Sequence, residues 1–184
     1  MSPAFSSFDT LILVAMFMKS YIIKSRLALN ESERKGNHMV VRVDGDACPV
    51  RASILKITNK HGVETVMYTD VNHEFSYETT CVITVDQGID SVDLAIIRDM
   101  RVGDVVITND YGLASLVLGK KGYAMDANGR AFTLNNIDQL LFERHMHKSL
   151  RMMKKRHKGP KKRDRHADEL FSLNFEALLL QVKA

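Results

Sequence analysis

Residues 40–50 read VVRVDGDACPV, and this stretch decides the predicted fold. A β-branched run, typical of a strand, ends at two carboxylates, Asp44 and Asp46. Pro49 follows, and proline is favoured at the first position of a helix, where its missing N–H costs nothing. The stretch therefore predicts a buried strand that leads into a helix. Cys48 would be the capping residue, so both aspartates lie too early in the chain to cap.

The alternation of strand and helix continues along the chain. Further strand-like apolar runs lie at residues 63–69, 81–85, 104–108, 123–125 and, shorter, 131–133. Helical patterns lie between them, from Pro49 to Gly62, from Ser91 to Met100 and from Tyr111 to Gly122. Most of the strand runs are nearly continuous in apolar residues, as expected for strands that are covered on both faces. The pattern predicts an α/β fold, with a mostly parallel sheet and helices on both faces.

The first 38 residues differ from the rest. Their apolar run, LILVAMFM at residues 11–18, is shorter than the roughly 20 residues of a membrane span, so we expect no stable membrane insertion. A secretory signal would need positive charge before the run, where only Asp9 is charged. Because the first clear strand follows Met39, we expect residues 1–38 to be an extension or an artefact of the chosen start codon. A membrane-contacting amphipathic leader is the alternative.

Charge is unevenly distributed over the rest of the chain. Residues 39–142 carry nine Lys/Arg and fourteen Asp/Glu, whereas residues 143–184 carry twelve and five. We expect an α/β domain over residues 39–150 and a basic linker with a C-terminal helix over residues 151–184. A basic appendage on an acidic body favours a polyanionic partner, although a solvated basic helix without a partner would look the same. The residues predicted to hold a nucleic-acid backbone are Lys154, Lys155, Arg156, Lys158, Lys161, Lys162 and Arg163.

Carboxylates follow several of the predicted strands. In an open parallel sheet, ligands bind outside the carboxyl ends of the strands. Asp44 and Asp110 follow the first and fourth strands, Asp126 follows the fifth, and Asp93 lies in the first turn of the helix after the third. We expect these side chains to meet at one edge of the sheet. Three of them have a purely structural alternative: Asp110 could cap a helix, Asp93 could complement a helix dipole, and Asp126 could begin the Asn-Gly turn.

Asp44 and Asp46 favour a metal ion, because neighbouring carboxylates repel each other unless a proton or a cation lies between them. Mg²⁺ or Mn²⁺ would suit a few carboxylates plus water. The predicted ligands are Asp44, Asp46, Asp93, Asp110 and Asp126. D-G-D-A-C also resembles the opening of the haloacid-dehalogenase phosphatases, in which the first aspartate is a nucleophile. Those enzymes need a later acidic motif after a strand, whereas Asp104 precedes one. No glycine fingerprint of a P-loop or dinucleotide site follows any strand.

Four stretches carry a resemblance to a known family: VDGDACPV at 43–50, SVDLAIIRDMRVGDVVITNDYGLASLVLGKKG at 91–122, ANGRAFTLNNIDQLLFERHMHKSLR at 127–151 and GPKKR at 159–163. Over about residues 39–180 the chain resembles the bacterial YaiI/YqxD family, which is functionally uncharacterised and is grouped with the PIN-like domains. The family's V-D-A-D-x-C-P has Gly45 here in place of alanine. Its S-A-D motif corresponds to Ser91-Val92-Asp93, and its T-x-D-x-x-L-A motif to Thr108 through Ala114.

The resemblance implies a PIN-like three-layer sandwich with acidic residues at one edge of the sheet. Many PIN-like proteins are metal-dependent ribonucleases, and Asp44, Asp93 and Asp110 match their catalytic acidic cluster. Asp46 is a feature of this family, and Asp126 takes a fourth position. The implied function is hydrolysis of phosphodiester bonds, with single-stranded RNA as the first substrate to try. Because a fold does not determine an activity, a non-catalytic RNA- or ribosome-binding factor is the alternative.

Three further expectations concern the compartment, the oligomeric state and Cys48. Cys48 and Cys81 are too few for a disulfide framework and point to a reducing cytoplasm. Exposed helix or strand surfaces could support a homodimer, as in many PIN-like proteins, but nothing in the sequence demands one. Cys48 could be a reactive thiol at the rim of the pocket, although a small buried helix cap is the favoured interpretation.

Overall fold

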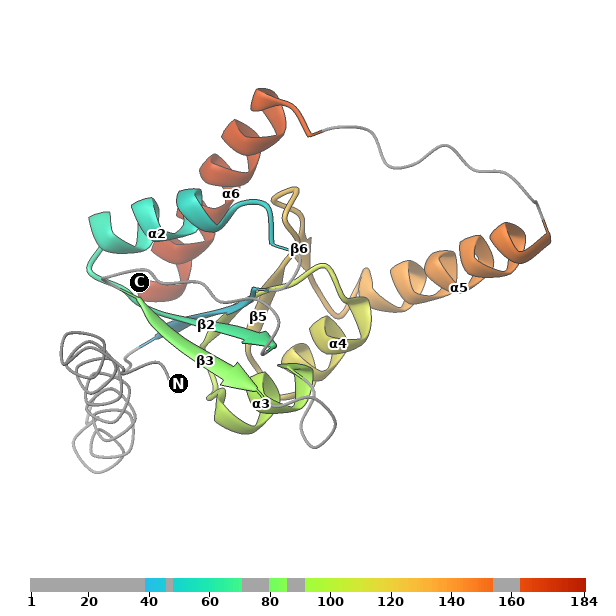
Figure 1. Cartoon of the computed structure of the whole chain (residues 1–184), viewed down its shortest axis with the longest axis horizontal. Coiled ribbons are helices and arrows are strands. Elements are labelled where there is room, and N and C mark those ends of the chain that lie inside the picture. Colours follow the sequence, from blue (N-terminus) through green and yellow to red (C-terminus); the bar gives the residue numbers. More distant parts are fainter. Residues whose placement is uncertain (1–38, 46–47, 71–79, 86–91, 154–162) are drawn as a thin grey trace, which may run out of the picture. The chain divides into compact units, whose positions relative to one another are not determined.

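The computed structural model describes residues 39–45, 48–70, 80–85, 92–153 and 163–184, with only the backbone described over 147–153. All of these residues belong to one compact unit, Met39–Ala184. The strands are β1 (Val40–Asp44), β2 (Glu64–Asp70), β3 (Cys81–Val85), β4 (Val105–Ile107), β5 (Tyr123–Met125) and β6 (Ala131–Phe132). They form one sheet in the order β3-β2-β1-β4-β5-β6 (Figure 1). The pairings from β3 through β5 are parallel, and β6 is antiparallel to β5.

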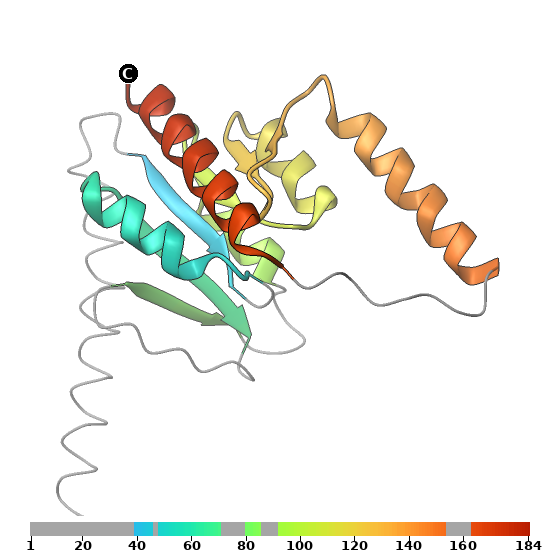
Figure 2. The same ribbon diagram turned by 90° about the horizontal axis from the view of Figure 1, so that it is seen from above.

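Helices cover both faces of this sheet. They are α2 (Arg51–Lys60), α3 (Val92–Asp99), α4 (Tyr111–Gly119), α5 (Ile137–Met153) and α6 (Arg165–Lys183). Helices α2 and α6 lie side by side on one face, as Figure 2 shows from above. Helices α3 and α4, with the start of α5, pack on the other face. The predicted α/β three-layer sandwich with a mostly parallel sheet is confirmed.

Alternate residues of each central strand enter opposite cores. Val41 and Val43 of β1 pack beneath α2 and α6, whereas Val40 points to α3 and α4. Strands covered in this way need apolar residues at successive positions, which explains their nearly continuous apolar runs. Phe171 and Phe175 of α6 are fully buried and stacked, with ring centroids 5.4 Å apart. The C-terminal helix after the basic segment is therefore part of the core.

One buried ion pair ties β1 to the residue before β4. Arg42 points from β1 towards α3 and is only 2% exposed, as is Asp104. The Nε of Arg42 donates to Asp104 Oδ2 at 2.8 Å, and the backbone N–H of Val40 donates to Asp104 Oδ1 at 3.0 Å. Arg42 also donates to the hydroxyl of Tyr68 on β2. Because buried charges must be paired, this network fixes how β1 and β4 align.

The start of α2 differs from the prediction. The first helical hydrogen bond runs from the N–H of Ile54 to the carbonyl of Val50, at 3.0 Å, so Val50 is the N-cap and Cys48 is not. Pro49 therefore lies in the turn before the helix instead of in its first position. Cys48 is 5% exposed and belongs to the core under α2 and α6. The prediction that Cys48 is buried is confirmed, and the prediction that it caps the helix is wrong.

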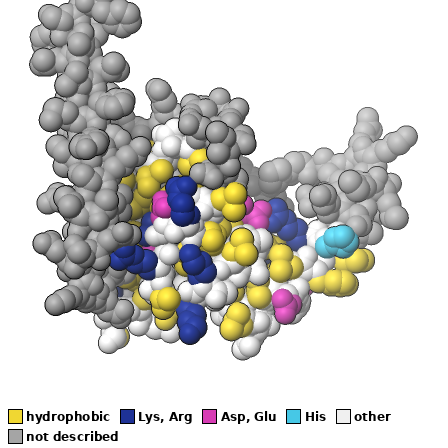
Figure 3. Space-filling model, turned by 90° about the horizontal axis from the view of Figure 1, so that it is seen from below, with side chains coloured by type: hydrophobic (Ala, Val, Ile, Leu, Met, Phe, Trp, Pro, Cys, Tyr) yellow, Lys and Arg dark blue, Asp and Glu magenta, His cyan; other side chains and the backbone are white. Residues whose placement is uncertain are grey.

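The face seen from below in Figure 3 carries α3 and α4. Hydrophobic side chains lie there among Lys and Arg side chains rather than in one continuous patch. Leu94 of α3 and Leu116 of α4 are each about half exposed. Scattered apolar side chains of this kind are ordinary on a protein surface. They give no specific support for the predicted homodimer, which stays a prediction.

Candidate functional site

The strand order changes direction between β1 and β4. Strands β2 and β3 continue from β1 in one direction and β4 and β5 in the other, so the topological switch point lies between β1 and β4. Open α/β sheets bind ligands at this point, outside the carboxyl ends of the strands. Val43 of β1 is in register with Ile107 of β4. Asp44 and Thr108, the next residues along these two strands, therefore reach the edge together.

Thr108 connects two of the predicted site residues. Its hydroxyl, which is buried, donates to Oδ2 of Asp44 at 2.9 Å. The same hydroxyl oxygen accepts a hydrogen bond from the backbone N–H of Asp110 at 3.0 Å. The threonine thus fixes the Asp44 side chain against the loop that carries Asp110. Thr108 was not among the predicted site residues, although the T-x-D spacing marked it.

Asp110 is the N-cap of α4, as its structural alternative predicted. Its Oδ1 accepts from the backbone N–H groups of Gly112, at 2.6 Å, and Leu113, at 3.3 Å. Its Oδ2 pairs with Arg144 of α5 at 3.0 Å. Partial burial opposes ionisation of Asp110, but the hydrogen bonds from Arg144, Gly112 and Leu113 outweigh it and lower the pKa of the carboxyl. Asp110 is therefore a fixed anion, and its side chain is 39% exposed.

Asp93 lies in the first turn of α3, near enough to Asp110 for their charges to interact. Partial burial, and then the negative charge of Asp110, raise the pKa of the Asp93 carboxyl. Two carboxylates from different helices therefore approach each other without enough positive charge around Asp93 to favour its ionised form. A cation between them would relieve this repulsion.

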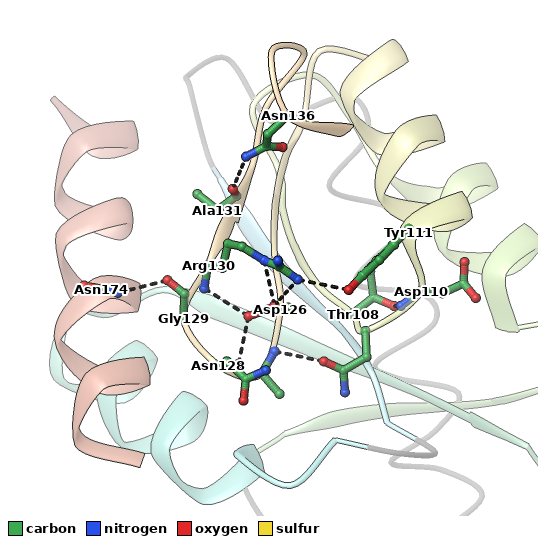
Figure 4. Close-up of polar contacts among 12 residues, drawn as sticks. Thr108, Asp110, Tyr111, Asp126, Asn128, Gly129, Arg130, Ala131, Asn136 and Asn174 are labelled. Atoms are coloured by element: carbon green, nitrogen blue, oxygen red, sulfur yellow. Dashed lines mark hydrogen bonds and ion pairs between the residues drawn. The ribbon is translucent and has the colours of Figure 1, made fainter. Parts of the chain in front are cut away.

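The side chain of Asp126 stabilises the turn between β5 and β6. It is buried, and its Oδ1 accepts from the backbone N–H groups of Asn128, at 2.8 Å, and Arg130, at 3.0 Å. Its Oδ2 pairs with the Arg130 guanidinium at 3.1 Å (Figure 4). This is the turn-forming role that the sequence allowed as an alternative. An ion at Asp126 would have to displace Arg130 from Oδ2.

The described residues contain no ready-made metal cage, because no three of their His, Cys, Asp or Glu side chains are placed to hold one ion. Asp46 lies outside the described residues. Mg²⁺, however, commonly keeps several waters and is held by only one or two carboxylates. Asp44 and the loop of Asp110 meet through Thr108, and the charges of Asp93 and Asp110 interact, so any ion here would be held by one or two carboxylates and water.

The predicted nucleic-acid-binding tail is described at one residue only. Lys154, Lys155, Arg156, Lys158, Lys161 and Lys162 lie outside the described residues. Arg163 donates to the carbonyl of Ala127 at 2.6 Å and to Oδ1 of Asn128 at 3.2 Å, and it pairs with Asp168 of α6. It therefore joins the turn after β5 to the start of α6, and its contact with nucleic acid stays a prediction.

The fold and the acidic switch point define an α/β protein with a polar site outside the carboxyl ends of its parallel strands. The chain belongs to a family described as "Uncharacterized BCR, YaiI/YqxD family", whose model matches residues 42–181. The predicted family is thereby confirmed. Its grouping with the PIN-like domains stays an inference from resemblance.

Several similar proteins share the name "UPF0178 protein". A "UPF0178 protein" of Exiguobacterium sibiricum is 43% identical over 143 residues, which cover 78% of this chain and 98% of the relative. Proteins of the same name from Natranaerobius thermophilus and Clostridium kluyveri are 40% and 39% identical, over 79% of this chain and 99% and 95% of their own lengths. No solved structure matches the chain. Among the described helices, none combines the length and the apolar character needed to cross a membrane.

Proposed function

We propose that the protein is a divalent-metal-dependent ribonuclease that hydrolyses phosphodiester bonds in single-stranded RNA. The observation that carries the proposal is the contact, at the switch point, between Asp44 and the loop that carries Asp110. Asp44 and Asp110 are joined through Thr108. Asp93 and Asp110 interact through their charges. A group of carboxylates in which one, here Asp93, has a raised pKa because of burial and a neighbouring negative charge is typical of a functional site.

Each carboxylate has a role that follows from its surroundings. A bound Mg²⁺ or Mn²⁺ would lower the pKa of a water molecule and stabilise the developing charge on the phosphodiester. Asp44 is oriented by the Thr108 hydroxyl, so its position does not depend on the ion. Asp110 stays ionised because of its helix-capping and arginine contacts. Asp93, whose ionised form is disfavoured, provides the charge that a cation stabilises most.

The ion pair between Arg144 and Asp110 can be exchanged for a bound cation. The pair involves side chains that are 48% and 39% exposed, and such pairs contribute roughly 0–1 kcal/mol. A cation can therefore replace Arg144 at Asp110 at small cost. The released guanidinium can pair with a substrate phosphate, for which its planar donor groups are well suited.

The proposal is tested by cleavage of labelled single-stranded RNA with Mg²⁺ or Mn²⁺, with Asp44→Asn and Asp110→Asn as variants. Asparagine can still accept the hydrogen bond from Thr108 and is a good N-cap, so both variants should fold. We expect each to lower cleavage by about 10- to 100-fold. The control is Glu176→Gln. Glu176 lies on α6 and pairs with Lys60, the last residue of α2, so it is remote from the switch point, which lies near the start of α2.

A non-catalytic RNA-binding factor is the second candidate. It is favoured by the lack of a three-ligand group among the described residues and by the Arg144 partner of Asp110. If the wild type binds RNA but cuts none with either metal, this candidate replaces the nuclease. In both versions, replacing the six lysines and arginines at 154–162 by alanine should weaken RNA binding and reduce its salt dependence. Unchanged affinity would reject the role of the tail.

A further inference from the structure

A cleft of about 560 Å³ lies beside the acidic site, between the loops after β4 and β5 and the start of α6. The loop after β4 borders both. Thr108 and Asp110 belong to the acidic site, the group formed by Asp44, Asp93, Thr108 and Asp110. Asn109 and Tyr111 line the cleft. Figure 4 shows Tyr111 and Asp110 pointing in different directions from consecutive positions. The loop after β4 therefore contributes alternate residues to the acidic site and to the cleft.

Two side-chain amides offer hydrogen-bond donors at the cleft. Oδ1 of Asn109 accepts from the backbone N–H of Ala127 at 3.0 Å, and Oδ1 of Asn128 accepts from Arg163 at 3.2 Å. These contacts determine which end of each amide is the oxygen. Within the described residues, neither Nδ2 group makes a hydrogen bond of its own. Both can donate to a ligand.

The aromatic ring of Tyr111 is held rigidly in the wall of the cleft. Its hydroxyl accepts from Arg130 at 3.0 Å, and its ring meets Phe132 edge to face, with centroids 5.5 Å apart. The guanidinium groups of Arg130 and Arg144 lie 5.7 and 5.4 Å from the ring centroid. Rings and guanidinium planes are the surfaces on which unpaired bases stack.

The charges around the cleft argue against a simple phosphate site. Arg130 is paired with the buried Asp126, and Arg163 with Asp168. Asp164, also in the lining, caps α6 and adds a negative charge. A phosphate would thus gain little attraction here. A flat, uncharged heterocycle that accepts hydrogen bonds would use both the amides and the ring.

We propose that this cleft is a nucleobase subsite, which takes the base of one nucleotide of single-stranded RNA. Because Tyr111 directly follows Asp110, a base in the cleft leaves the phosphate of its own nucleotide within reach of the acidic site. The identity of the polymer rests on the proposed function. Base binding itself requires neither a metal ion nor cleavage.

The test is a two-dimensional NMR titration of the full chain in EDTA. The ligands are the four ribonucleosides, their 5′-monophosphates and ribose 5-phosphate. We expect the backbone amides of Asn109, Tyr111, Ala127 and Asn128 to shift with nucleosides and nucleotides, and not with ribose 5-phosphate. Equal shifts with ribose 5-phosphate would show a phosphate site and overturn the inference. The absence of nucleoside-induced shifts at these amides would overturn it as well.

Two variants sharpen the test. Tyr111→Leu should weaken nucleoside binding about tenfold or more, because it removes the stacking surface. The matched control is Tyr123→Leu, a tyrosine that is 39% exposed at the start of β5 and so at the opposite end of the strands. Asn109→Asp keeps the acceptor for Ala127 but loses the donor. It should weaken binding even of uncharged nucleosides, and unchanged binding in both Tyr111→Leu and Asn109→Asp would overturn the subsite.

Failure of the subsite and failure of the nuclease are separable. Asp44→Asn should lower cleavage as stated above and leave nucleoside binding intact. RNA cleavage without nucleoside binding would refute the subsite alone. Nucleoside binding without cleavage under any metal would support the subsite and refute the nuclease.

Discussion

Removal of the Asp104 carboxylate should destabilise the protein severely, because Arg42 would be left buried with its charge uncompensated. Asp104 accepts hydrogen bonds from Arg42 at 2.8 Å, from the N–H of Val40 at 3.0 Å and from the N–H of Arg101 at 2.9 Å. Both members of the ion pair have side chains that are 3% exposed. Breaking a buried pair by removing one partner costs about 3–5 kcal/mol.

A loss of that size is a large fraction of the roughly 5–15 kcal/mol that stabilises a typical domain. We therefore expect Asp104→Ala to lower the free energy of unfolding by about 3–5 kcal/mol, measured by urea denaturation followed by circular dichroism. Since the pair aligns β1 with β4, the contact between Asp44 and Thr108 should weaken too, and RNA cleavage should fall in the fraction that remains folded.

The matched comparison removes both charges. In Arg42→Met/Asp104→Leu no buried charge is left unpaired, so much of the loss should be recovered. Glu176, which contacts Lys60 and His61 and has a side chain that is 29% exposed, gives the opposite control, because Glu176→Gln keeps an oxygen for these contacts and should cost much less than Asp104→Ala. The reasoning is refuted if Asp104→Ala costs less than about 1 kcal/mol, or if the double variant is no more stable than the single one.

Three further predictions concern single groups. The pKa of Asp93 is raised in the folded chain, so the unfolded chain loses this proton at a lower pH than the folded chain does. The free energy of unfolding therefore falls as the pH rises from the pKa of the unfolded state to that of the folded state. Asp93→Asn should therefore stabilise the protein at neutral pH but not below both pKa values, and equal thermal shifts at the two pH values would contradict this. Gly129→Ala should cost about 2 kcal/mol in urea unfolding, because φ is +80° and the new Cβ would lie 2.9 Å from Cα of Phe171; an unchanged midpoint would exclude this strain. Burial raises the pKa of Cys48 to about 11, so iodoacetamide should modify it far more slowly than a free thiol at mildly alkaline pH, as followed by mass spectrometry. Labelling of Cys48 at the free-thiol rate in the folded protein would show that the thiol is accessible after all.

Much of the fold could be predicted because its signals are local. The β-branched runs at 40–43 and 81–85 and the apolar spacing from Tyr111 onward each specify an element through its own period. The order in which strands and helices alternate then favours a parallel sheet, whose carboxyl edge collects whatever follows the strands. This reasoning placed Asp44 and Asp110 at the same edge, and the structure joins them through Thr108.

The roles of individual carboxylates could not be predicted in the same way. Asp110 and Asp126 look alike in the sequence, since each follows a strand. In the folded chain one caps α4 and meets Arg144 from α5, whereas the other is buried under Arg130. Each outcome depends on where distant segments arrive.

The sequence by itself determined the elements, their order and the edge at which the acidic residues gather, because periodicity and turn chemistry act between neighbouring residues. Only the tertiary structure decided that α6 completes one core, that Arg42 needs Asp104, and that Asn109 and Tyr111 line a cleft beside the carboxylates. These contacts join residues far apart in the chain. A carboxylate's partner, burial and pKa are therefore set by packing, which no local pattern records.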